Sequence, residues 1–362
     1  MTSRVVDDRV WMRRAFALAR RGWGQVSPNP MVGAIVVRDH VAVGRGWHAR
    51  YGLAHAEAMA LAEAGSASQG ATLYVTLEPC AHHGKQPPCV NAVIASGVTR
   101  VVVASPDPNP EARGGIARLR EAGIVVDVGI GEAAARALNA PFFFAHQGAT
   151  RPYVTLKLAV TVDGAIADHR RTPGWFTGPE SRRAVHALRA SADAIAVGRQ
   201  TVVDDDPALT VREGWQPRVP PIRVVLARTG GLPSSSQLVR TASSVPVWFV
   251  GTPAAADARS LQAAGVTVIP ASTLAASLEA LRVLGIRHLF VEGGATIAGA
   301  LLEAGLVDRL VIFRAPLVLG TGALPAFAGL GARSWANAVR LHPRVRRRIG
   351  DDLLEIYTME WP

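Results

Sequence analysis

The stretch "LEPCAHHGKQPPC" (77–89) contains both cysteines of a chain of 362 residues. Eight residues separate Cys80 from Cys89, and two prolines directly precede the second cysteine. Two thiols with this spacing can form a disulfide, bind a metal ion or pack in a core. The residues around them decide between these three possibilities.

The composition is that of a globular protein, with 49% hydrophobic and 19% charged residues. The length exceeds that of one hydrophobic core, so we expect two domains. No apolar run approaches about 20 residues, so we expect no membrane segment. The N-terminal stretch 1–23 lacks the layout of a signal peptide and predicts an amphipathic helix with Val10, Phe16 and Leu18 facing inward. We therefore expect a cytoplasmic protein, in which a stable disulfide is disfavoured.

The net charge of +11 raises the alternative of a nucleic-acid-binding protein with a structural zinc ion. That alternative predicts an affinity for DNA or RNA that falls steeply with salt. However, the arginines are scattered, and only "HPRVRRR" (342–348) forms a compact run. Aromatic residues, which stack on bases, make up only 6% of the chain. We expect no nucleic-acid partner and attribute the charge to arginine-rich composition and to sites for phosphorylated small molecules.

Strand-like and helix-like runs alternate along the whole chain, which predicts an α/β protein. A polar stretch, "AHQGATRPYV" (145–154), interrupts the pattern and predicts a boundary between domains 1–147 and 148–362. In the first half we expect strands at 31–37, 41–47, 71–77 and 100–105, with helices at 54–65, 88–97 and 115–123. In the second half we expect extended stretches at 153–167, 193–198, 222–227, 245–251 and 266–271, a helix at 179–191, and a strand–helix–strand unit at 288–313.

His55 and Glu57, in "HAE" (55–57), begin one expected helix, and Cys89 begins another, since prolines suit a first helical turn. Helix N-termini favour negative charge, so they favour the thiolate that binds metal. Two thiolates and one imidazole suit tetrahedral Zn²⁺ with a fourth position for water. Zinc lowers the pKa of that water toward ~7, and Glu57 can carry its proton. In the alternative, a closed structural zinc site, His82 or His83 fills the fourth position, which leaves Glu57 without a role.

The pairing of H-x-E with a later P-C resembles the signature of zinc deaminases, although there two residues separate the cysteines. Together with "SPNPMVGAIVV" (27–37), "GRGWH" (44–48), "TLEPCAHHGKQPPC" (76–89) and "DPNP" (107–110), the first half resembles one family closely. That family is the bifunctional riboflavin-biosynthesis deaminase–reductase. The resemblance implies a cytidine-deaminase-like α/β/α domain with one zinc ion, held by His55, Cys80 and Cys89. It also implies that Glu57 is the catalytic proton shuttle.

The same resemblance implies substrate contacts that read a pyrimidine edge and ribose, with Lys85 on a phosphate. The positions are Asn29, His48, Lys85, Asp107 and Asn109. In the structural alternative, the residues beside prolines (Asn29, Asp107 and Asn109) only cap turns. The stretch "EARGGIARL" (111–119) is about one residue shorter than in the family, a change that affects one wall of the pocket.

In the second half, "VEGGATIAGALLEAG" (291–305) predicts a strand, a Gly-Gly turn and a helix whose N-terminus a phosphate can approach. The motif is not G-x-G-x-x-G. With "TLKLAVTVDGAIA" (155–167), "GWFTGPESR" (174–182) and "GRQTVVDDDPALTVR" (198–212), it resembles the dihydrofolate-reductase-like, NADPH-dependent α/β domain of the same family. The resemblance thus covers nearly all of the chain.

This second resemblance implies an NADPH site and a neighbouring substrate site. NADPH would contact Ala159, Trp175, Thr201, Asp205 and the turn of Gly294, Ala295, Thr296, Ile297, Ala298, Gly299 and Ala300. The substrate would contact Lys157, Arg189, Leu209, Arg212 and Glu292. The chain departs from the family at Pro173, where a polar residue is usual, and at Ala227 and Arg228, where Asp and Ser are common.

The resemblance predicts an enzyme of riboflavin biosynthesis with two activities. The first domain removes the 2-amino group of 2,5-diamino-6-ribosylamino-4(3H)-pyrimidinone 5′-phosphate, and the second reduces the ribosyl side chain to ribityl with NADPH. We expect phosphorylated pyrimidines as partners and a homo-oligomer, dimeric or tetrameric. The departures at Pro173 and Ala227 sustain one alternative, a deaminase whose second domain is inactive.

Overall fold

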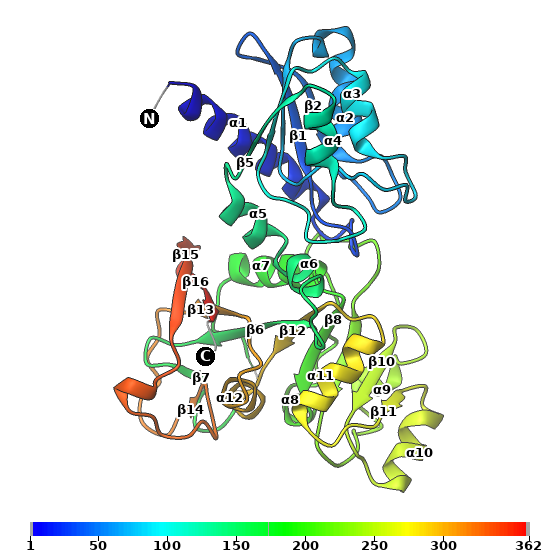
Figure 1. Ribbon diagram of the computed structural model, residues 1–362. Coiled ribbons are helices and arrows are strands. Elements are labelled where there is room, and N and C mark those ends of the chain that lie inside the picture. The colour runs from blue at the N-terminus through cyan, green and yellow to red at the C-terminus, as the bar shows by residue number, and fades with distance from the viewer. Residues whose placement is uncertain (1–2, 173, 360–362) are drawn as a thin grey trace. The chain divides into compact units, whose positions relative to one another are not determined.

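The computed structural model describes residues 3–172 and 174–359 (Figure 1). They form two compact units, Met1–Ala149 and Thr150–Pro362, which divide within the polar stretch 145–154. Pro173 lies outside the described residues. No helix of the described chain is long and apolar enough to cross a membrane.

The first unit is a five-stranded sheet with helices on both faces (Figure 1). The strands lie in the order β2-β1-β3-β4-β5; β1 is antiparallel to both neighbours, and β3, β4 and β5 are parallel. The strands are β1 Gly33–Arg38, β2 Val41–Trp47, β3 Thr72–Val75, β4 Arg100–Val103 and β5 Val125–Val128. The helices are α1 Ser3–Ala19, α2 Ala56–Ala64, α3 Cys89–Ala95, α4 Gly115–Glu121, α5 Glu132–Leu138 and α6 Ala140–Ala145, with short 3-10 turns at Arg20–Gly22 and Gly65–Ser68.

The alternation of side chains along β1 explains the two helical layers. Ala34 and Val36 belong to the core under α2 and α3, whereas Ile35 and Val37 belong to the core under α1. Successive strand residues point to opposite faces, so a strand that is apolar throughout must be covered on both sides. Phe16 and Leu18 of α1 are buried as expected, while Val10 is half-buried. The predicted α/β/α architecture is confirmed.

Two glycines of β2 bring the sheet into unusually close contact with α2. A Cβ at Gly44 would lie 2.1 Å from the carbonyl oxygen of Ala60, and one at Gly46 would lie 2.0 Å from that of Ala56. No side chain fits at either position, because real Cβ contacts are never that short. The main chain of α2 therefore rests directly on β2, and its first residues have a fixed position at the end of the sheet.

A buried ion-pair network ties α1 to the centre of this sheet. Asp8 receives two hydrogen bonds from Arg100, of 2.7 and 2.8 Å, and one from the hydroxyl of Tyr74 at 2.8 Å. Arg100 also pairs with Asp127 at 2.6 Å. The Asp8 side chain is 3% exposed and that of Asp127 is 45% exposed. The network matters chiefly through Asp8, because a buried charge that loses its partner stays uncompensated.

The second unit is a nine-stranded sheet in the order β11-β10-β9-β8-β12-β6-β13-β16-β15. The seven strands from β11 to β13 are parallel, and β16 and β15 are antiparallel additions at one edge. The strands are β6 Tyr153–Val160, β8 Ala194–Gly198, β9 Ile222–Leu226, β10 Val247–Val250, β11 Thr267–Ile269, β12 His288–Glu292, β13 Arg309–Arg314, β15 Leu341–Ile349 and β16 Asp352–Met359. A separate pair joins β7 Ala165–Ala167 to β14 Leu324–Pro325.

Helices cover both faces of the large sheet. They are α7 Pro179–Ala190, α8 Arg199–Asp205, α9 Gln237–Arg240, α10 Ala255–Ala263, α11 Leu274–Val283 and α12 Ala295–Glu303, with a 3-10 turn at Trp335–Asn337. One core lies between the sheet and α11 and α12, and the other between the sheet and α7 to α10. The expected extended stretch 153–167 divides into β6 and β7, because Thr161 and Asp163 form a turn between them.

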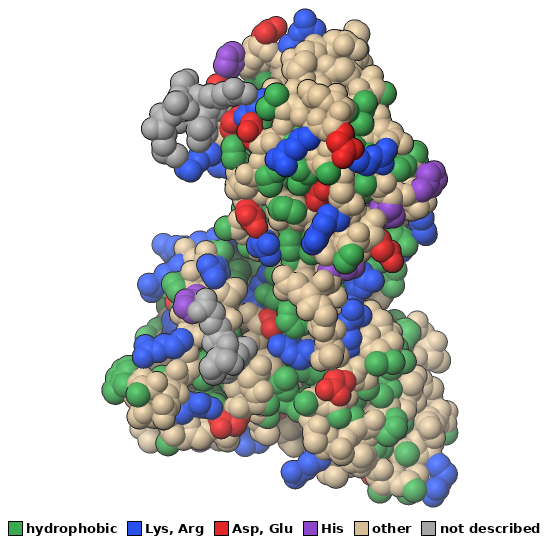
Figure 2. All heavy atoms as spheres, in the orientation of Figure 1, with side chains coloured by type: hydrophobic (Ala, Val, Ile, Leu, Met, Phe, Trp, Pro, Cys, Tyr) green, Lys and Arg blue, Asp and Glu red, His purple; other side chains and the backbone are tan. Residues whose placement is uncertain are grey.

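The C-terminal hairpin of β15 and β16 was not expected from the sequence. The run "HPRVRRR" lies within β15, the edge strand, where the arginines are exposed. Figure 2 shows Lys and Arg side chains gathered where Figure 1 places β15 and β16. Exposed charges on an edge strand oppose pairing with other chains.

We predict that Asp8→Ala lowers the free energy of unfolding of the first unit by about 3–5 kcal/mol, because Arg100 loses its buried partner. Asp127→Ala, which removes the exposed partner of the same arginine, should cost no more than about 1 kcal/mol. Urea unfolding followed by hydrogen exchange in peptides of residues 1–149 measures both. Equal effects of the two substitutions would contradict the assignment of the stability to Asp8.

Candidate functional site

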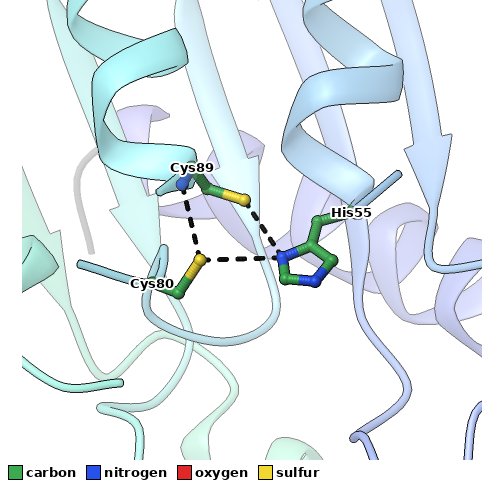
Figure 3. Close-up of side chains that lie close together, drawn as sticks. All are labelled: His55, Cys80 and Cys89. Atoms are coloured by element: carbon green, nitrogen blue, oxygen red, sulfur yellow. Dashed lines mark hydrogen bonds between the residues drawn. The ribbon is translucent and has the colours of Figure 1, made fainter. Parts of the chain in front are cut away.

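His55, Cys80 and Cys89 meet at one end of the first sheet (Figure 3). His55 caps the N-terminus of α2, Cys80 lies in the loop after β3, and Cys89 begins α3. The Nδ1 atom of His55 lies 3.2 Å from Sγ of Cys89 and 3.6 Å from Sγ of Cys80. All three ligand atoms lie within 4.8 Å of one another. The three residues therefore come from separate elements and converge on one point.

This donor set suits a zinc ion. Two sulfurs and one imidazole nitrogen match zinc sites in which the protein supplies three ligands and leaves the fourth position open. Both cysteines are buried and free, so the disulfide alternative does not hold in this structure. A hydrogen bond from Cys89 lowers the pKa of Cys80 to about 4, whereas the same contact and burial raise the pKa of Cys89. One sulfur is thus predisposed to be a thiolate.

Neither histidine of the cysteine loop belongs to this group. In the described part of the chain, the convergent set consists of His55, Cys80 and Cys89. His83 is exposed, and His82 lines the neighbouring cavity. The closed four-ligand site is therefore not the arrangement seen here.

Glu57 lies in the first turn of α2, two residues after His55, and is buried. Burial raises its pKa to about 7, against the opposing effect of the nearby His55. The carboxyl group faces the same cavity as the metal ligands. A carboxyl group so placed can accept and return a proton within the cavity.

A cavity of about 260 Å³ adjoins two of the three ligands, His55 and Cys80. Its walls include every substrate contact implied by the resemblance in this half of the chain. These are Asn29, His48, Lys85, Asp107 and Asn109, together with His55, Glu57 and Cys80. Residues from four separated stretches of sequence thus line one space.

Two of these residues hold each other in a defined orientation. The ring nitrogen Nδ1 of His48 lies 3.3 Å from the carbonyl of Ala54, so it donates and Nε2 accepts. Nδ2 of Asn29 lies 3.2 Å from that Nε2. Burial lowers the pKa of His48, which keeps its ring neutral and the pair intact. The amide oxygen of Asn29, a residue that lines the cavity, remains available as an acceptor.

Another part of the cavity wall combines a turn with functional groups. Oδ1 of Asp107 accepts the main-chain N–H of Asn109 at 2.8 Å, so this residue does cap a turn. It is nevertheless buried in the cavity wall, where burial raises its pKa to about 6. The ammonium of Lys85 lies 4.3 Å from the ring centre of Tyr51. The turn that Asp107 caps is therefore itself a part of the cavity wall.

Glu78, which the sequence analysis gave no role, organises this wall. Its carboxylate accepts three main-chain N–H groups, those of Asp107, Gly114 and Ile116, each at 3.0 Å. Gly115 packs so closely on the loop that a Cβ there would lie 1.8 Å from the carbonyl oxygen of Pro79. Loop 107–115, including the shortened stretch, is thus bound to the cysteine loop. The signal in the sequence that could have revealed this role is the position of Glu78, two residues before Cys80.

In the second unit, three charged residues meet where β6, β12 and α7 adjoin. Glu292 ends β12 and is the register partner of Lys157 on β6. Arg189 of α7 binds both carboxylate oxygens of Glu292, with Nη2 to Oε2 at 3.0 Å. Burial opposes ionisation of Glu292, but Arg189 and Lys157 lower its pKa overall. Burial lowers the pKa of Lys157.

Arg189 also connects this cluster to the segment after α8. Its Nη1 donates to the carbonyl of Thr210 at 2.7 Å. Leu209 is buried in the core under α7 to α10, so it offers the site its main chain. The side chain of Arg212 is exposed. The structure thus brings together Lys157, Arg189 and Glu292 and places Leu209 and Arg212 on one adjoining segment.

The glycine turn after β12 begins α12 beside α8. A Cβ at Gly294 would lie 3.2 Å from the hydroxyl of Thr201, and one at Gly198 would lie 3.6 Å from Cβ of Ile297. These positions lie at the carboxyl ends of parallel strands β8 and β12, where open α/β sheets bind ligands. Small residues there leave the main chain accessible, as a dinucleotide phosphate requires.

The other residues of the implied cofactor site are more dispersed. Ala159 lies near the end of β6, and Asp205 ends α8, where burial raises its pKa. Trp175 is 61% exposed and contacts Arg182, and none of its described contacts joins it to α12. Further along the helix, Ala295 and Ala298 belong to the buried core, and a Cβ at Gly299 would lie 2.0 Å from the carbonyl oxygen of Ala328. Thr296 and Ala300 are exposed.

The departures at Ala227 and Arg228 involve main-chain contacts. The N–H of Ala227 donates to Val250 at 3.1 Å, and the carbonyl of Arg228 accepts from Thr252. Main-chain groups of this kind are present in any residue other than proline. Their side chains therefore do not decide how this end of β9 is held.

We predict that the protein binds one zinc ion per chain, and that Cys80→Ser and Cys89→Ser each lower this stoichiometry. A hydroxyl group is a poor substitute for a thiolate ligand. Metal content of dialysed protein, measured by inductively coupled plasma mass spectrometry, gives the ratio. His82→Asn and His83→Asn are matched controls that should retain the ion. Loss of zinc from either control would instead support the closed site.

Comparisons with known proteins agree with this geometry. Residues 5–105 match the cytidine and deoxycytidylate deaminase zinc-binding region, and residues 152–354 match the RibD C-terminal domain. The riboflavin biosynthesis protein RibD of Aquifex aeolicus is 42% identical over 351 residues, covering 96% of this chain and 97% of that protein. The protein of the same name from Escherichia coli is 40% identical and covers 96% of this chain and 98% of its own length.

Solved structures are similar over the same span. RibD of Acinetobacter baumannii superposes with a TM-score of 0.85 at 36% identity, covering 99% of this chain and 100% of that one. A diaminohydroxyphosphoribosylaminopyrimidine deaminase/5-amino-6-(5-phosphoribosylamino)uracil reductase from Thermotoga maritima gives 0.85 at 32% identity, covering 98% and 99%. Because both halves match and the coverage is nearly complete, the chain belongs to the RibD family of bifunctional deaminase–reductases of riboflavin biosynthesis.

Proposed function

We propose that residues 1–147 form a zinc-dependent deaminase domain and residues 148–362 an NADPH-dependent reductase domain. The first acts on 2,5-diamino-6-ribosylamino-4(3H)-pyrimidinone 5′-phosphate and replaces its 2-amino group with oxygen, releasing ammonia. The second reduces the ribosyl side chain of the product to ribityl. The observation that carries the proposal is the convergence of His55, Cys80 and Cys89 beside a cavity that Glu57 also lines.

Zinc, when bound, supplies a water of lowered pKa, near ~7, as the nucleophile at neutral pH. Glu57 would take one proton of the attacking water and deliver it to the ring nitrogen, and would then take the second proton of the same water and deliver it to the departing amino group, which leaves as ammonia. Its carboxyl group is suited to this because it is buried beside the ligands without a lysine or arginine partner in the described chain. A tight ion pair would hold the proton-accepting oxygens and slow the exchange.

The walls of the cavity position the pyrimidine. The Asn29 amide, oriented by His48, presents an acceptor to the amino and N–H groups of the ring edge. Asp107 and Asn109, on the wall held by Glu78, are suited to ribose hydroxyls. Lys85, at the mouth of the cavity over Tyr51, provides a cation for the 5′-phosphate.

NADPH supplies the hydride of the second reaction, so the protein has mainly to hold and orient it. We assign the cofactor to the residues around the α12 turn: Ala159, Trp175, Thr201, Asp205 and Gly294 to Ala300. The substrate side consists of Lys157, Arg189, Leu209, Arg212 and Glu292. Arg212 is the exposed cation of this set and is suited to bidentate binding of the ribose phosphate.

The setting of the enzyme is part of the proposal. A chain with +11 net charge attracts phosphorylated pyrimidines without a nucleic-acid partner. We place it in the cytoplasm, because buried metal-binding thiols persist in a reducing compartment. We also propose a homo-oligomer, dimeric or tetrameric.

Glu57→Gln should abolish deamination, with a loss of about 10²–10⁴-fold or more in kcat, because the amide cannot carry the proton. Mass spectrometry of the product measures exchange of the amino group for oxygen and, with NADPH, the addition of hydrogen. The variant should still reduce intermediate that wild-type protein has deaminated, and should still bind zinc. Full deamination by Glu57→Gln would refute the proposed role, and absence of NADPH-dependent reduction in both proteins would indicate an inactive second domain.

Glu78→Gln should raise the KM for deamination by about tenfold, since one carboxylate acceptor of the loop is lost. Zinc content should stay the same, because Glu78→Gln removes none of the three ligands. Steady-state release of ammonia measures KM. Glu111→Gln, an exposed substitution in the same loop, is the control and should match wild type. A loss of zinc in Glu78→Gln would show that the residue supports the metal instead.

A further inference from the structure

The segment that carries Leu209 and Arg212 has an unfavourable main-chain conformation. Leu209 has φ of 48° and Glu213 has φ of 58°, both in the left-handed region that side-chain-bearing residues rarely adopt. Such conformations persist only where the surroundings enforce them. Something outside the segment must therefore hold it.

Helix α7 provides that hold through two residues three positions apart. Residues with this spacing lie on the same face of a helix. Arg189 donates to the carbonyl of Thr210 at 2.7 Å, and the main-chain N–H of Arg212 donates to Nδ1 of His186 at 3.0 Å. The segment is thus fastened at both a carbonyl and an N–H, on either side of Val211.

His186 is not among the residues that the sequence pattern singled out, yet its chemistry is well defined here. Because Nδ1 accepts from a main-chain N–H, the ring proton must be on Nε2. The side chain is buried, and burial together with Arg189 and Arg212 lowers its pKa. The neutral ring keeps the acceptor available at neutral pH.

Arg212, the residue fastened in this way, has a side chain with no partner among the residues that the structure describes. The Arg212 guanidinium is exposed, and in the described chain no ion pair or side-chain hydrogen bond holds it. Its position therefore depends on the main chain from which it extends. An arginine whose Cα is fixed and whose charge is unpaired is suited to bind an anionic ligand.

We propose that His186 is a positioning residue of the reductase: its Nδ1 fixes the main chain of Arg212 so that this guanidinium meets the phosphate of the substrate. The inference rests on the proposed contact between Arg212 and substrate. It adds a residue that acts through Arg212 and touches neither substrate nor cofactor. Arg189 shares the task by holding Thr210 and Glu292 together.

The test compares three substitutions of His186 in the full-length protein. Asn places an acceptor oxygen where Nδ1 lies, Gln places its amide near Nε2, and Leu removes the acceptor at similar volume. The substrate is the deaminated intermediate made by wild-type protein without NADPH, and loss of NADPH absorbance gives the rate. We expect His186→Leu and His186→Gln to raise the KM for the intermediate about tenfold, with kcat and the KM for NADPH little changed. His186→Asn should stay close to wild type.

A double-mutant cycle separates this inference from the function on which it rests. Arg212→Ala should raise the same KM, and adding His186→Leu should raise it no further, because both act through one contact. If Arg212→Ala leaves KM unchanged, the proposed phosphate contact is wrong and the inference falls with it. If Arg212→Ala raises KM but His186→Leu does not, only the role of His186 is refuted. The role of His186 is also refuted if the two substitutions raise the KM for the intermediate multiplicatively. It is refuted too if His186→Asn raises this KM as much as His186→Leu does. The deamination rate of each variant should equal wild type.

Discussion

The first site depends on the direct contact between the main chains of α2 and β2. Gly44 and Gly46 permit it, since a Cβ at either would collide with a carbonyl oxygen of the helix. Any larger residue would push α2 outward and move His55 and Glu57, which both lie at its start. The zinc ligands converge within 4.8 Å only while the starts of α2 and α3 keep their separation. A packing constraint without polar chemistry therefore sets the geometry of the metal centre.

The sequence predicted much of this because its signals are local. Alternating apolar strands indicated the α/β architecture, and the resemblance of the motifs around His55, Glu57, Cys80 and Cys89 to one family implied the deaminase-like centre. The C-terminal hairpin was not predicted from the sequence, because β15 is almost wholly exposed and carries arginines where strands usually carry apolar residues. What makes it a strand is pairing with β16, a contact that no local pattern records. Helices α5 and α6 were not predicted, because they are short and few of their side chains are buried.

The same hairpin explains the one compact run of positive charge. Glu355 of β16 is buried and pairs with Arg314 at 3.0 Å and with Arg346 at 3.6 Å, so part of the charge is compensated within the sheet. Arg348 pairs with Asp351 at the turn. Charged side chains on the last strand also discourage further strands from adding to a nine-stranded sheet. A cluster of arginines in sequence thus has a structural cause here, separate from any binding role.

Three glutamates, two buried and one half-buried, show why roles within a site are harder to predict than its location. Glu78 accepts hydrogen bonds from three main-chain N–H groups, so its lone pairs are occupied in holding the loop 107–116. Glu292 accepts hydrogen bonds from Nε and Nη2 of Arg189, so its charge is engaged in an ion pair. Glu57 contacts the thiol of Cys89 and its own main-chain N–H and pairs with no lysine or arginine of the described chain, and burial raises its pKa to about 7. The chemistry of each carboxylate follows from the bonds already made to it, and those partners come from elements distant in sequence. His186 was overlooked for the same reason, since its one informative bond is to a main-chain N–H 26 positions away.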